Sequence, residues 1–334
     1  MSLLKKKCWR IGIARFWTME QLFEAVEPHM GALVKIKLFA SDGREANAAL
    51  LGAFGRIARL DTILSDYHPE SELNRICRFA SERPVVVSPD VFRVLQFAQC
   101  LAKETDGAFD VTAGPLNRLW REARRHQQLP DAQSVNRARD FCGYRKLELD
   151  AVNRTIKLDV RHMQFDLGGI GKGYAADEAI AALLQRGIEC ALVNFSGELR
   201  LIGNPPGQMG WRIGLKWRNG TSAAQMRTVR LTNGAVSTSG GEEQHLCLNG
   251  VCYSHIVDPR TGWALTEPIT VSVLAPDGLK ADSLSTAISV LGREMGASFI
   301  ERTHDVAAVV SSESEPSVHF GQSFQRELLR NSAS

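Results

Sequence analysis

The sequence lacks long hydrophobic runs and any strong excess of charge of one sign. No segment approaches the roughly 20 consecutive apolar residues of a membrane-spanning helix, so no membrane span is expected. The formal net charge is +3 over 334 residues, with basic and acidic side chains interspersed. Nucleic-acid binding needs a continuous basic surface, so no nucleic-acid partner is expected either. We interpret the short basic run at 121–126 as a solvated helix face.

Paired cysteines are also missing. The seven cysteines include no Cys-x-x-Cys pair, and their number is odd. In a chain of this length, that pattern predicts reduced, mostly buried thiols, no disulfide and no cysteine metal site. The basic cluster at 5–7 is not followed by an apolar run of signal-peptide length, because Arg10 and Arg15 interrupt it. As written, the sequence predicts a cytoplasmic protein, and a chain that had lost a leader would look the same.

What is present is an ordinary globular composition, 44% hydrophobic, with clear local patterns. Helical spacing predicts helices over 44–64, 90–105, 115–126, 173–185, 279–291 and 293–301. Strand patterns occur at 32–40, in a hairpin over 146–158, and at 191–195, 199–202, 211–217, 228–231, 235–238, 251–256, 270–274 and 307–310. Mainly antiparallel strands with helices inserted in blocks predict an α+β fold.

A glycine-rich stretch at 166–175 (DLGGIGKGYA) is the most informative motif. Four glycines that open onto a helix let the backbone approach a ligand and present N–H groups to phosphate. The stretch is not a Walker loop, because Gly173 replaces the serine or threonine that would hold magnesium. Tyr174 stands where a dinucleotide fingerprint has its third glycine. A tight structural turn explains such a loop about as well as a phosphate site does.

Two further motifs carry chemistry. Asp282 and Thr286 lie one helical turn apart in 281–287, and their oxygens suit Mg²⁺. The alternative is that Asp282 caps the helix and Thr286 only packs. As a site ligand, Asp282 is expected to be exposed. In the segment 253–262, a strand ends and a turn follows that contains His255, Asp258 and Arg260. These residues could act in catalysis or simply form the turn.

Together these motifs resemble the ApbE family, the FAD:protein FMN transferases. The matching segments, which span roughly 28–310, are Met30 with Gly31, Tyr67 with 71–73 (SEL), 106–116 (DGAFDVTAGPL), 171–173 (GKG), 193–197 (VNFSG), 236–240 (VSTSG), 255–262 (HIVDPRTG) and 282–286 (DSLST). So many motifs in a fixed order are far more specific than any one of them.

The resemblance implies a role for each matching residue. Asp282 and Thr286 would bind Mg²⁺, and a backbone oxygen of Gly171 would complete the site. Tyr67 would lie against the flavin, and His255, near the reacting phosphates, would act as general base. The other residues that the resemblance places in the FAD pocket are Met30, Asp110, Gly169, Lys172 and Ser239.

The resemblance also implies an architecture and a reaction. It predicts an N-terminal extension at 1–27, an ApbE-like (T-fold-like) domain at 28–315 with a central FAD cleft between two subdomains, and a tail at 316–334. A serine or threonine hydroxyl of an acceptor flavoprotein would attack the FMN phosphorus of FAD, and AMP would leave. Two alternatives stay open, an FAD pyrophosphatase that releases FMN and AMP, and a carrier that binds FAD without turnover. The protein is expected to be a monomer or a homodimer.

Several positions depart from the family pattern. Ala32 replaces a common threonine, and Cys77 stands where an asparagine is usual, with Asn74 nearby. Glu198 replaces an aspartate, and Gly241–Glu242 replace an acidic and aromatic pair. These changes predict altered FAD affinity, whereas Asp282, Thr286 and His255 are intact.

Overall fold

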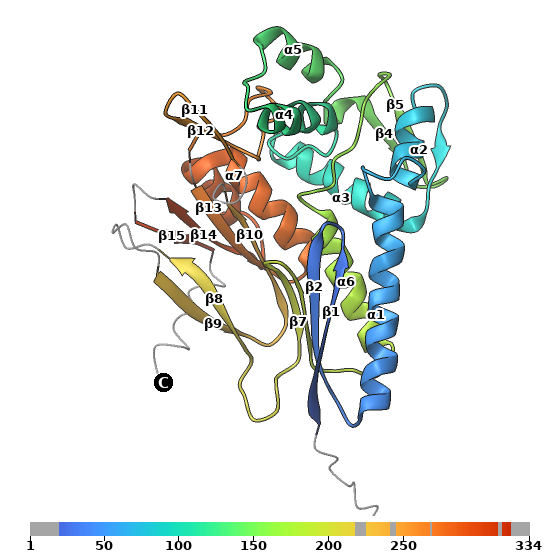
Figure 1. Cartoon of the computed structure of the whole chain (residues 1–334), viewed down its shortest axis with the longest axis vertical. Coiled ribbons are helices and arrows are strands. Elements are labelled where there is room, and N and C mark those ends of the chain that lie inside the picture. Colours follow the sequence, from blue (N-terminus) through green and yellow to red (C-terminus); the bar gives the residue numbers. More distant parts are fainter. Residues whose placement is uncertain (1–19, 218–224, 241–244, 268, 313–315, 322–334) are drawn as a thin grey trace, which may run out of the picture.

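An eight-stranded antiparallel sheet forms the centre of the structure (Figure 1). The computed structural model describes residues 20–217, 225–240, 245–267, 269–312 and 316–321. The strand order is β1 (Gln21–His29), β2 (Ala32–Ala40), β6 (Ala191–Phe195), β7 (Glu198–Ile202), β10 (Gly234–Gly240), β13 (Ile269–Ala275), β14 (Ala307–Ser312) and β15 (Val318–Phe320). Mixed helix and antiparallel sheet confirm the predicted α+β class.

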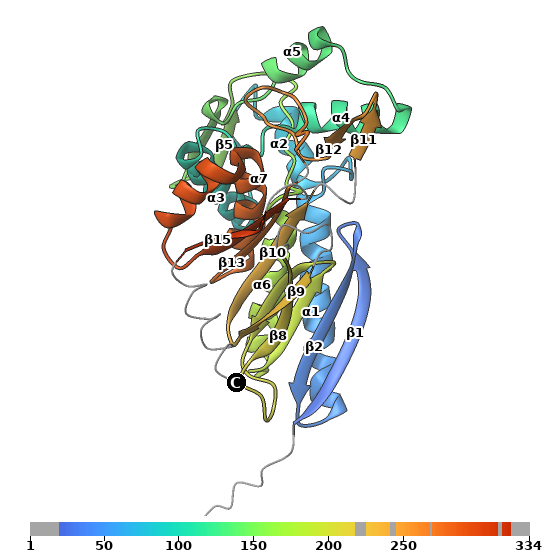
Figure 2. The same cartoon turned by 90° about the vertical axis from the view of Figure 1, so that its left-hand side faces the viewer.

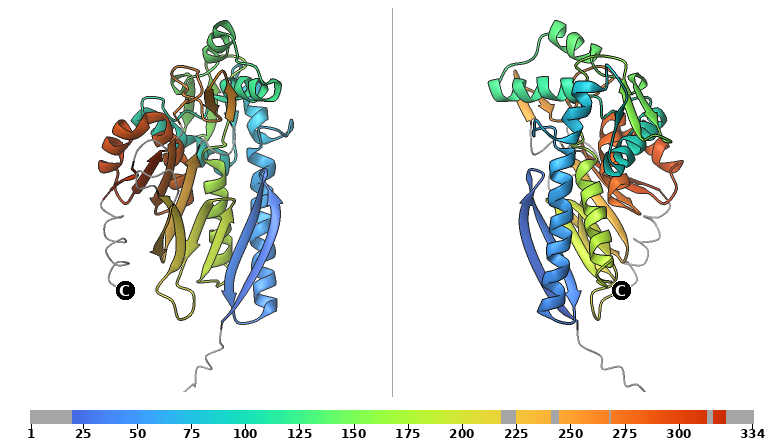
Figure 3. Two further views of the ribbon diagram at one scale, coloured as in Figure 1. Left: turned by 60° about the vertical axis from the view of Figure 1, so that its left-hand side comes forward. Right: turned by 90° about the vertical axis from the view of Figure 1, so that its right-hand side faces the viewer.

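The two faces of this sheet are covered differently. Helices α1 (Gly43–Leu64), α6 (Gly171–Leu184) and α7 (Gly278–Glu301) pack on one face, and α1 and α6 lie side by side in Figure 3. The hairpin of β8 (Trp211–Trp217) and β9 (Gln225–Leu231) covers the other face. Side chains alternate accordingly along each strand, so Val193 packs toward the helices and Leu192 toward the hairpin.

Local sequence explains why the first helix begins where it does. The side chain of Asp42 accepts hydrogen bonds from the backbone N–H groups of Arg44 (2.8 Å) and Glu45 (2.9 Å). This satisfies two donors that have no partner within the helix. Apolar residues at helical spacing, such as Ile57 and Leu60, are fully buried against the sheet and α6.

Smaller elements gather at one end of the large sheet, at the top of Figures 1 and 2. They are α2 (Glu72–Phe79), α3 (Pro89–Glu104), α4 (Gly114–His126), α5 (Ala132–Asp140), the 3₁₀ turn Tyr144–Lys146, the small sheet β3 (Val85–Val86), β5 (Thr155–Leu158) and β4 (Leu147–Asp150), and the hairpin β11 (His245–Leu248) and β12 (Val251–Ser254). Helix α4 and this hairpin share an apolar cluster around Trp120.

The predicted elements agree with most of the structure, including the break inside α7, where Gly292 has a φ of 74°. The patterns missed β1, α2, β3, α5, the 3₁₀ turn, β11 and β15. Strand β1 begins at Gln21 and β15 ends at Phe320, and both pair into the large sheet, which therefore reaches into the predicted extension at 1–27 and the predicted tail at 316–334. Within the described ranges, no helix combines the length and apolar character needed to cross a bilayer.

The first turns of α6 and α7 touch through glycine backbone. A Cβ atom added to Gly173 would lie 2.1 Å from the carbonyl oxygen of Gly278, and one added to Gly278 would lie 2.4 Å from that of Gly173. Asp177 of α6 fixes the same crossing, because its carboxylate accepts the N–H groups of Gly278 and Leu279, each at 2.8 Å. Only glycine permits this approach.

Gly173→Ala is therefore expected to lower the free energy of unfolding by about 1–3 kcal/mol, the usual cost of overpacking. Urea denaturation measures the change. Gly55→Ala is the matched control, because Gly55 is in a helix, and a Cβ there would meet no atom within 4 Å. If both variants are as stable as the parent, the glycine contact does not constrain the fold.

Candidate functional site

A cavity of about 730 Å³ lies where the glycine-rich loop, α4, α7 and β10 meet. Its size suits a cofactor or substrate site. Eight of the predicted site residues line it, namely Tyr67, Asp110, Gly169, Lys172, Ser239, His255, Asp282 and Thr286. Met30 and Gly171 are not among the lining residues. They pack behind the loop, where a Cβ added to Gly171 would lie 3.4 Å from Cε of Met30.

The loop and helix α7 form one oxygen-rich surface. Asp282 is only 2% exposed, and its Oδ2 accepts the N–H of Gly173 at 2.9 Å. Thr286 follows one turn later, and a Cβ added to Gly169 would lie 2.7 Å from its Oγ1. The expectation that Asp282 is exposed is thus wrong, because the glycine loop folds directly over it.

Asp282 is buried in a way that favours a bound cation. Burial and the charge of Glu198 raise the pKa of its carboxyl to about 7, although Lys172 opposes both effects. Lys172 Nζ lies 2.8 Å from Oε1 of Glu198, so much of its charge is balanced by that carboxylate. A divalent cation would stabilise the ionised form of Asp282, and its oxygen neighbours are the donors that Mg²⁺ prefers.

Ser239 connects β10 to the same helix. Its hydroxyl lies 2.7 Å from that of Ser285, which in turn donates to the carbonyl oxygen of Asp282 at 2.9 Å. Ser239 therefore lines the cavity and also fixes the distance between β10 and Asp282.

Asp110 has a structural role in addition to its place at the cavity. Its Oδ1 accepts the N–H (2.8 Å) and hydroxyl (2.7 Å) of Thr112, and its Oδ2 accepts the N–H of Tyr144 at 2.8 Å. Burial raises the pKa of this carboxyl, and the hydrogen bonds oppose that effect. Asp110 therefore holds the cavity wall in shape.

Tyr67 projects from a braced loop between α1 and α2, and is 77% exposed. The side-chain amide of Asn74 donates to the carbonyl oxygens of Asp66 (3.1 Å) and His68 (2.8 Å) on either side of it. Although Cys77 stands where the family usually has asparagine, Asn74 supplies an amide that holds this loop.

Helix α4 contributes residues that the sequence analysis assigned to a solvated face. Arg121 is only 33% exposed, and its guanidinium donates to Asp66 at 2.9 Å, to the hydroxyl of Tyr67 at 3.0 Å, and to Asp166. It also lies 5.1 Å from the centre of the Tyr67 ring. The interpretation of this run as solvated is wrong for Arg121 and Arg124, which both line the cavity. Their spacing from Asn117 (i, i+4, i+7) could have indicated one shared face.

His255 follows β12 directly and reaches the cavity from a fixed backbone. The N–H of Ser254 donates to the carbonyl oxygen of Leu265 at 2.7 Å, and its hydroxyl accepts the N–H of Ile256 at 3.1 Å. Asp258 accepts three hydrogen bonds from Arg260, each at 2.9 Å. Asp258 is thus engaged in the turn, which leaves His255 the better placed base.

Comparison with known proteins gives a consistent result. The family model described as "ApbE family" matches residues 30–310. The chain belongs to the ApbE family. It is 31% identical over 281 residues to an "FAD:protein FMN transferase" of Klebsiella pneumoniae (strain 342), covering 84% of this chain and 86% of that protein. A Treponema pallidum (strain Nichols) protein of the same name is 29% identical, covering 86% of this chain and 83% of that one.

Solved structures of ApbE proteins share this fold. "Flavin Transferase ApbE from Vibrio cholerae" superposes with a TM-score of 0.82 at 26% identity, covering 92% of this chain and 99% of that one. The apo form of the Pseudomonas stutzeri flavinyl transferase ApbE gives 0.81 at 27% identity, covering 92% and 97%. The relatives are named as transferases, so the family membership makes this protein an enzyme.

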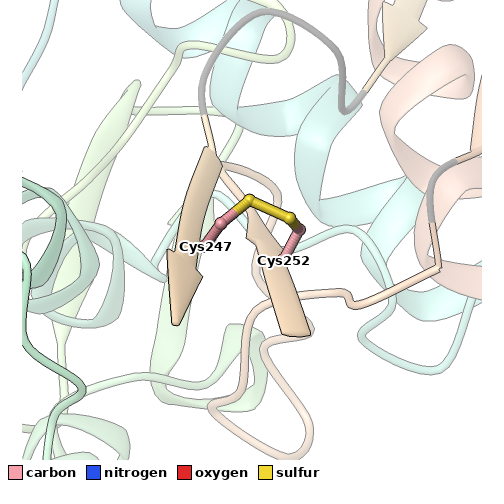
Figure 4. Close-up of a disulfide and its surroundings, with 2 residues drawn as sticks. All are labelled: Cys247 and Cys252. Atoms are coloured by element: carbon pink, nitrogen blue, oxygen red, sulfur yellow. A yellow bond between two sulfur atoms is a disulfide. The ribbon is translucent and has the colours of Figure 1, made fainter. Parts of the chain in front are cut away.

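A disulfide joins Cys247 and Cys252 in the hairpin that leads to His255 (Figure 4). The prediction of no disulfide is wrong here. It rested on the missing Cys-x-x-Cys spacing and on the odd number of cysteines. The two-residue turn Asn249–Gly250, both with positive φ, places these two cysteines directly opposite each other across the hairpin. The other cysteines that the structure describes, Cys77, Cys100, Cys142 and Cys190, are free.

We expect the double substitution Cys247→Ser with Cys252→Ser to lower the free energy of unfolding by about 2 kcal/mol, as for a crosslink that closes a short loop. Alkylation of the unfolded protein should modify two more thiols after reduction than before. Cys100→Ser, at an exposed free thiol, is the control and should change neither measurement. Equal alkylation with and without reductant would contradict the crosslink.

Proposed function

We propose that this protein is a Mg²⁺-dependent FAD:protein FMN transferase. It transfers FMN from FAD to a serine or threonine hydroxyl of an acceptor flavoprotein and releases AMP. The observation that carries this proposal is the cavity, which brings Asp282, Thr286 and His255 together from distant parts of a chain in the ApbE family. The names of the relatives supply the substrate and the acceptor class.

The residues present fit a magnesium ion. Asp282 and Thr286 line the cavity and would hold it, and the buried carboxylate of Asp282 gains most from a cation. The family resemblance adds a backbone oxygen of Gly171, which is not among the residues that line the cavity. Among the residues that the structure describes, no three His, Cys, Asp or Glu side chains cluster, but Mg²⁺ needs only one or two carboxylates besides water and phosphate oxygens. When bound, Mg²⁺ supplies charge neutralisation at the FAD pyrophosphate.

The protein itself positions the pyrophosphate and accepts a proton. Helix α6 begins at the glycine-rich loop, where the N–H of Gly173 already binds Asp282, and the positive end of the helix adds to the attraction for phosphate there. His255 accepts the proton of the acceptor hydroxyl as that oxygen forms a bond to the FMN phosphorus. The bond from this phosphorus to the AMP oxygen breaks, and AMP leaves. Positioning and charge stabilisation provide most of the catalysis in such reactions.

Asp282→Asn is expected to abolish AMP release from FAD, because it removes the negative charge that would bind Mg²⁺ while preserving the shape of the side chain. EDTA treatment of the parent should do the same. AMP is measured by chromatography, with and without an acceptor. Ser289→Ala, another buried polar position of α7, is the control and should stay active. Full activity of Asp282→Asn would contradict the proposal that Asp282 binds the Mg²⁺ that the reaction needs.

The same assay separates the transferase from its alternatives. AMP that appears only with acceptor indicates transfer, and AMP without acceptor indicates a pyrophosphatase. FAD that stays bound and unchanged indicates a carrier.

His255→Gln should slow transfer by about two orders of magnitude while leaving FAD affinity nearly unchanged, because it removes a proton acceptor and keeps a polar side chain. Single-turnover kinetics measure the rate, and fluorescence titration measures FAD binding. His304→Gln, at an exposed histidine, is the control. Weak FAD binding with a normal single-turnover rate would make His255 a binding residue instead.

Cellular location and oligomeric state stay predictions. The Cys247–Cys252 disulfide favours an oxidising compartment over the cytoplasm that the sequence suggested.

Gly241 and Glu242, where the family pattern differs, lie outside the described residues.

A further inference from the structure

Arg124 is a cationic side chain of the cavity that the proposed chemistry leaves without a role. It lines the cavity from the last turn of α4. Its Nη1 is buried and has no hydrogen-bond acceptor among the described residues. A buried donor normally has a partner, because leaving it unpaired costs free energy. Arg124 is therefore a candidate for binding a ligand group.

In the same cavity, the guanidinium of the neighbouring Arg121 has several hydrogen-bond acceptors. Asp66, Asp166 and the hydroxyl of Tyr67 accept its hydrogen bonds. Arg124 has no such set of partners, and both burial and the charge of Arg121 lower its pKa. An anion bound at this position would raise the pKa of Arg124 and so oppose both effects.

The position of Arg124 is rigid. Leu116, Trp120 and Ala123 of the same helix are buried in one apolar cluster, and Trp120 Nε1 donates to the carbonyl oxygen of Gly262 at 2.9 Å. Basic residues near a helix C-terminus often interact only with the helix dipole. Arg125 and His126 are exposed and fit that role, whereas Arg124 is half-buried at the cavity.

We propose that Arg124 determines acceptor specificity by binding a carboxylate that lies near the acceptor hydroxyl. This inference rests on the proposed function. The negative charges of FAD are its two phosphates, which the proposal assigns to Asp282, Thr286 and the glycine-rich loop. Arg124 instead lies near Tyr67, which would lie against the flavin, an uncharged part of FAD, so FAD offers Arg124 no anion there. Tyr67 is largely exposed, so a second protein can reach this part of the cavity. A guanidinium presents paired donors that match a carboxylate.

The test compares peptides that contain one threonine and differ only in an aspartate or asparagine within three residues of it on either side. Each is incubated with FAD and Mg²⁺, and the FMN-peptide is quantified by mass spectrometry. The parent should favour the best aspartate peptide over its asparagine partner by about tenfold in kcat/KM, as expected for one charged hydrogen-bonded pair. Arg124→Gln should lose this preference, and Arg124→Lys should retain part of it.

Two further measurements identify the source of the anion. FAD affinity should be the same in the parent and in Arg124→Gln, and a lysine peptide should become the best acceptor of Arg124→Glu. The exposed neighbour Arg125→Gln is the control and should keep the aspartate preference. If Arg124→Gln weakens FAD binding and transfer to both peptides equally, the anion is a phosphate of FAD and the inference is wrong.

Different results would contradict the role of Arg124 and the proposed transferase activity. Transfer by the parent with equal kcat/KM for aspartate and asparagine peptides overturns only the role of Arg124. Bound FAD with no transfer to any peptide overturns the proposed transferase, and the role of Arg124 with it.

Discussion

The close backbone contact between α6 and α7 is the constraint on which the rest of the site depends. Gly173 and Gly278 meet with no space for a Cβ on either side, and Asp177 fixes the N-terminus of α7 against α6. This contact brings the carboxylate of Asp282 to the N–H of Gly173. A larger residue at either glycine would separate the loop from the helix, and the oxygen-rich surface would no longer form.

The same contact creates an electrostatic cost. Asp282 is buried beside Glu198, and the one lysine near them, Lys172, is paired with Glu198, so its charge only partly offsets that of the two carboxylates. Such a carboxylate is costly to ionise without a cation. The proposed binding of Mg²⁺ together with substrate phosphates would offset this cost, and metal binding would then be coupled to the ionisation of Asp282.

Sequence patterns predicted the regular elements well because each depends on local spacing. Helix α1 has both a cap at Asp42 and a continuous apolar face. The edge strand β1 alternates only between exposed and half-buried residues, and Leu22 and Val26 on its exposed side remove the polar–apolar alternation from its sequence. Eight of the ten site residues that the family resemblance predicted line the cavity, but the inward direction of Arg121 depends on Asp166, which is distant in sequence. The disulfide likewise depends on a turn that brings two separated cysteines together.

The charged side chains of the cavity thus form two groups, and this arrangement suits a reaction with two substrates. The carboxylates of Asp282 and Glu198 lie at the glycine-rich loop, while Arg121 and Arg124 lie near Tyr67. Asp166 precedes the loop and binds Arg121, so a single ion pair joins the two groups. An acceptor that binds at the arginines would therefore contact the same network that positions the loop beneath the pyrophosphate. Acceptor binding and phosphate positioning would then be coupled through Arg121, which favours transfer to the acceptor over release of FMN to water.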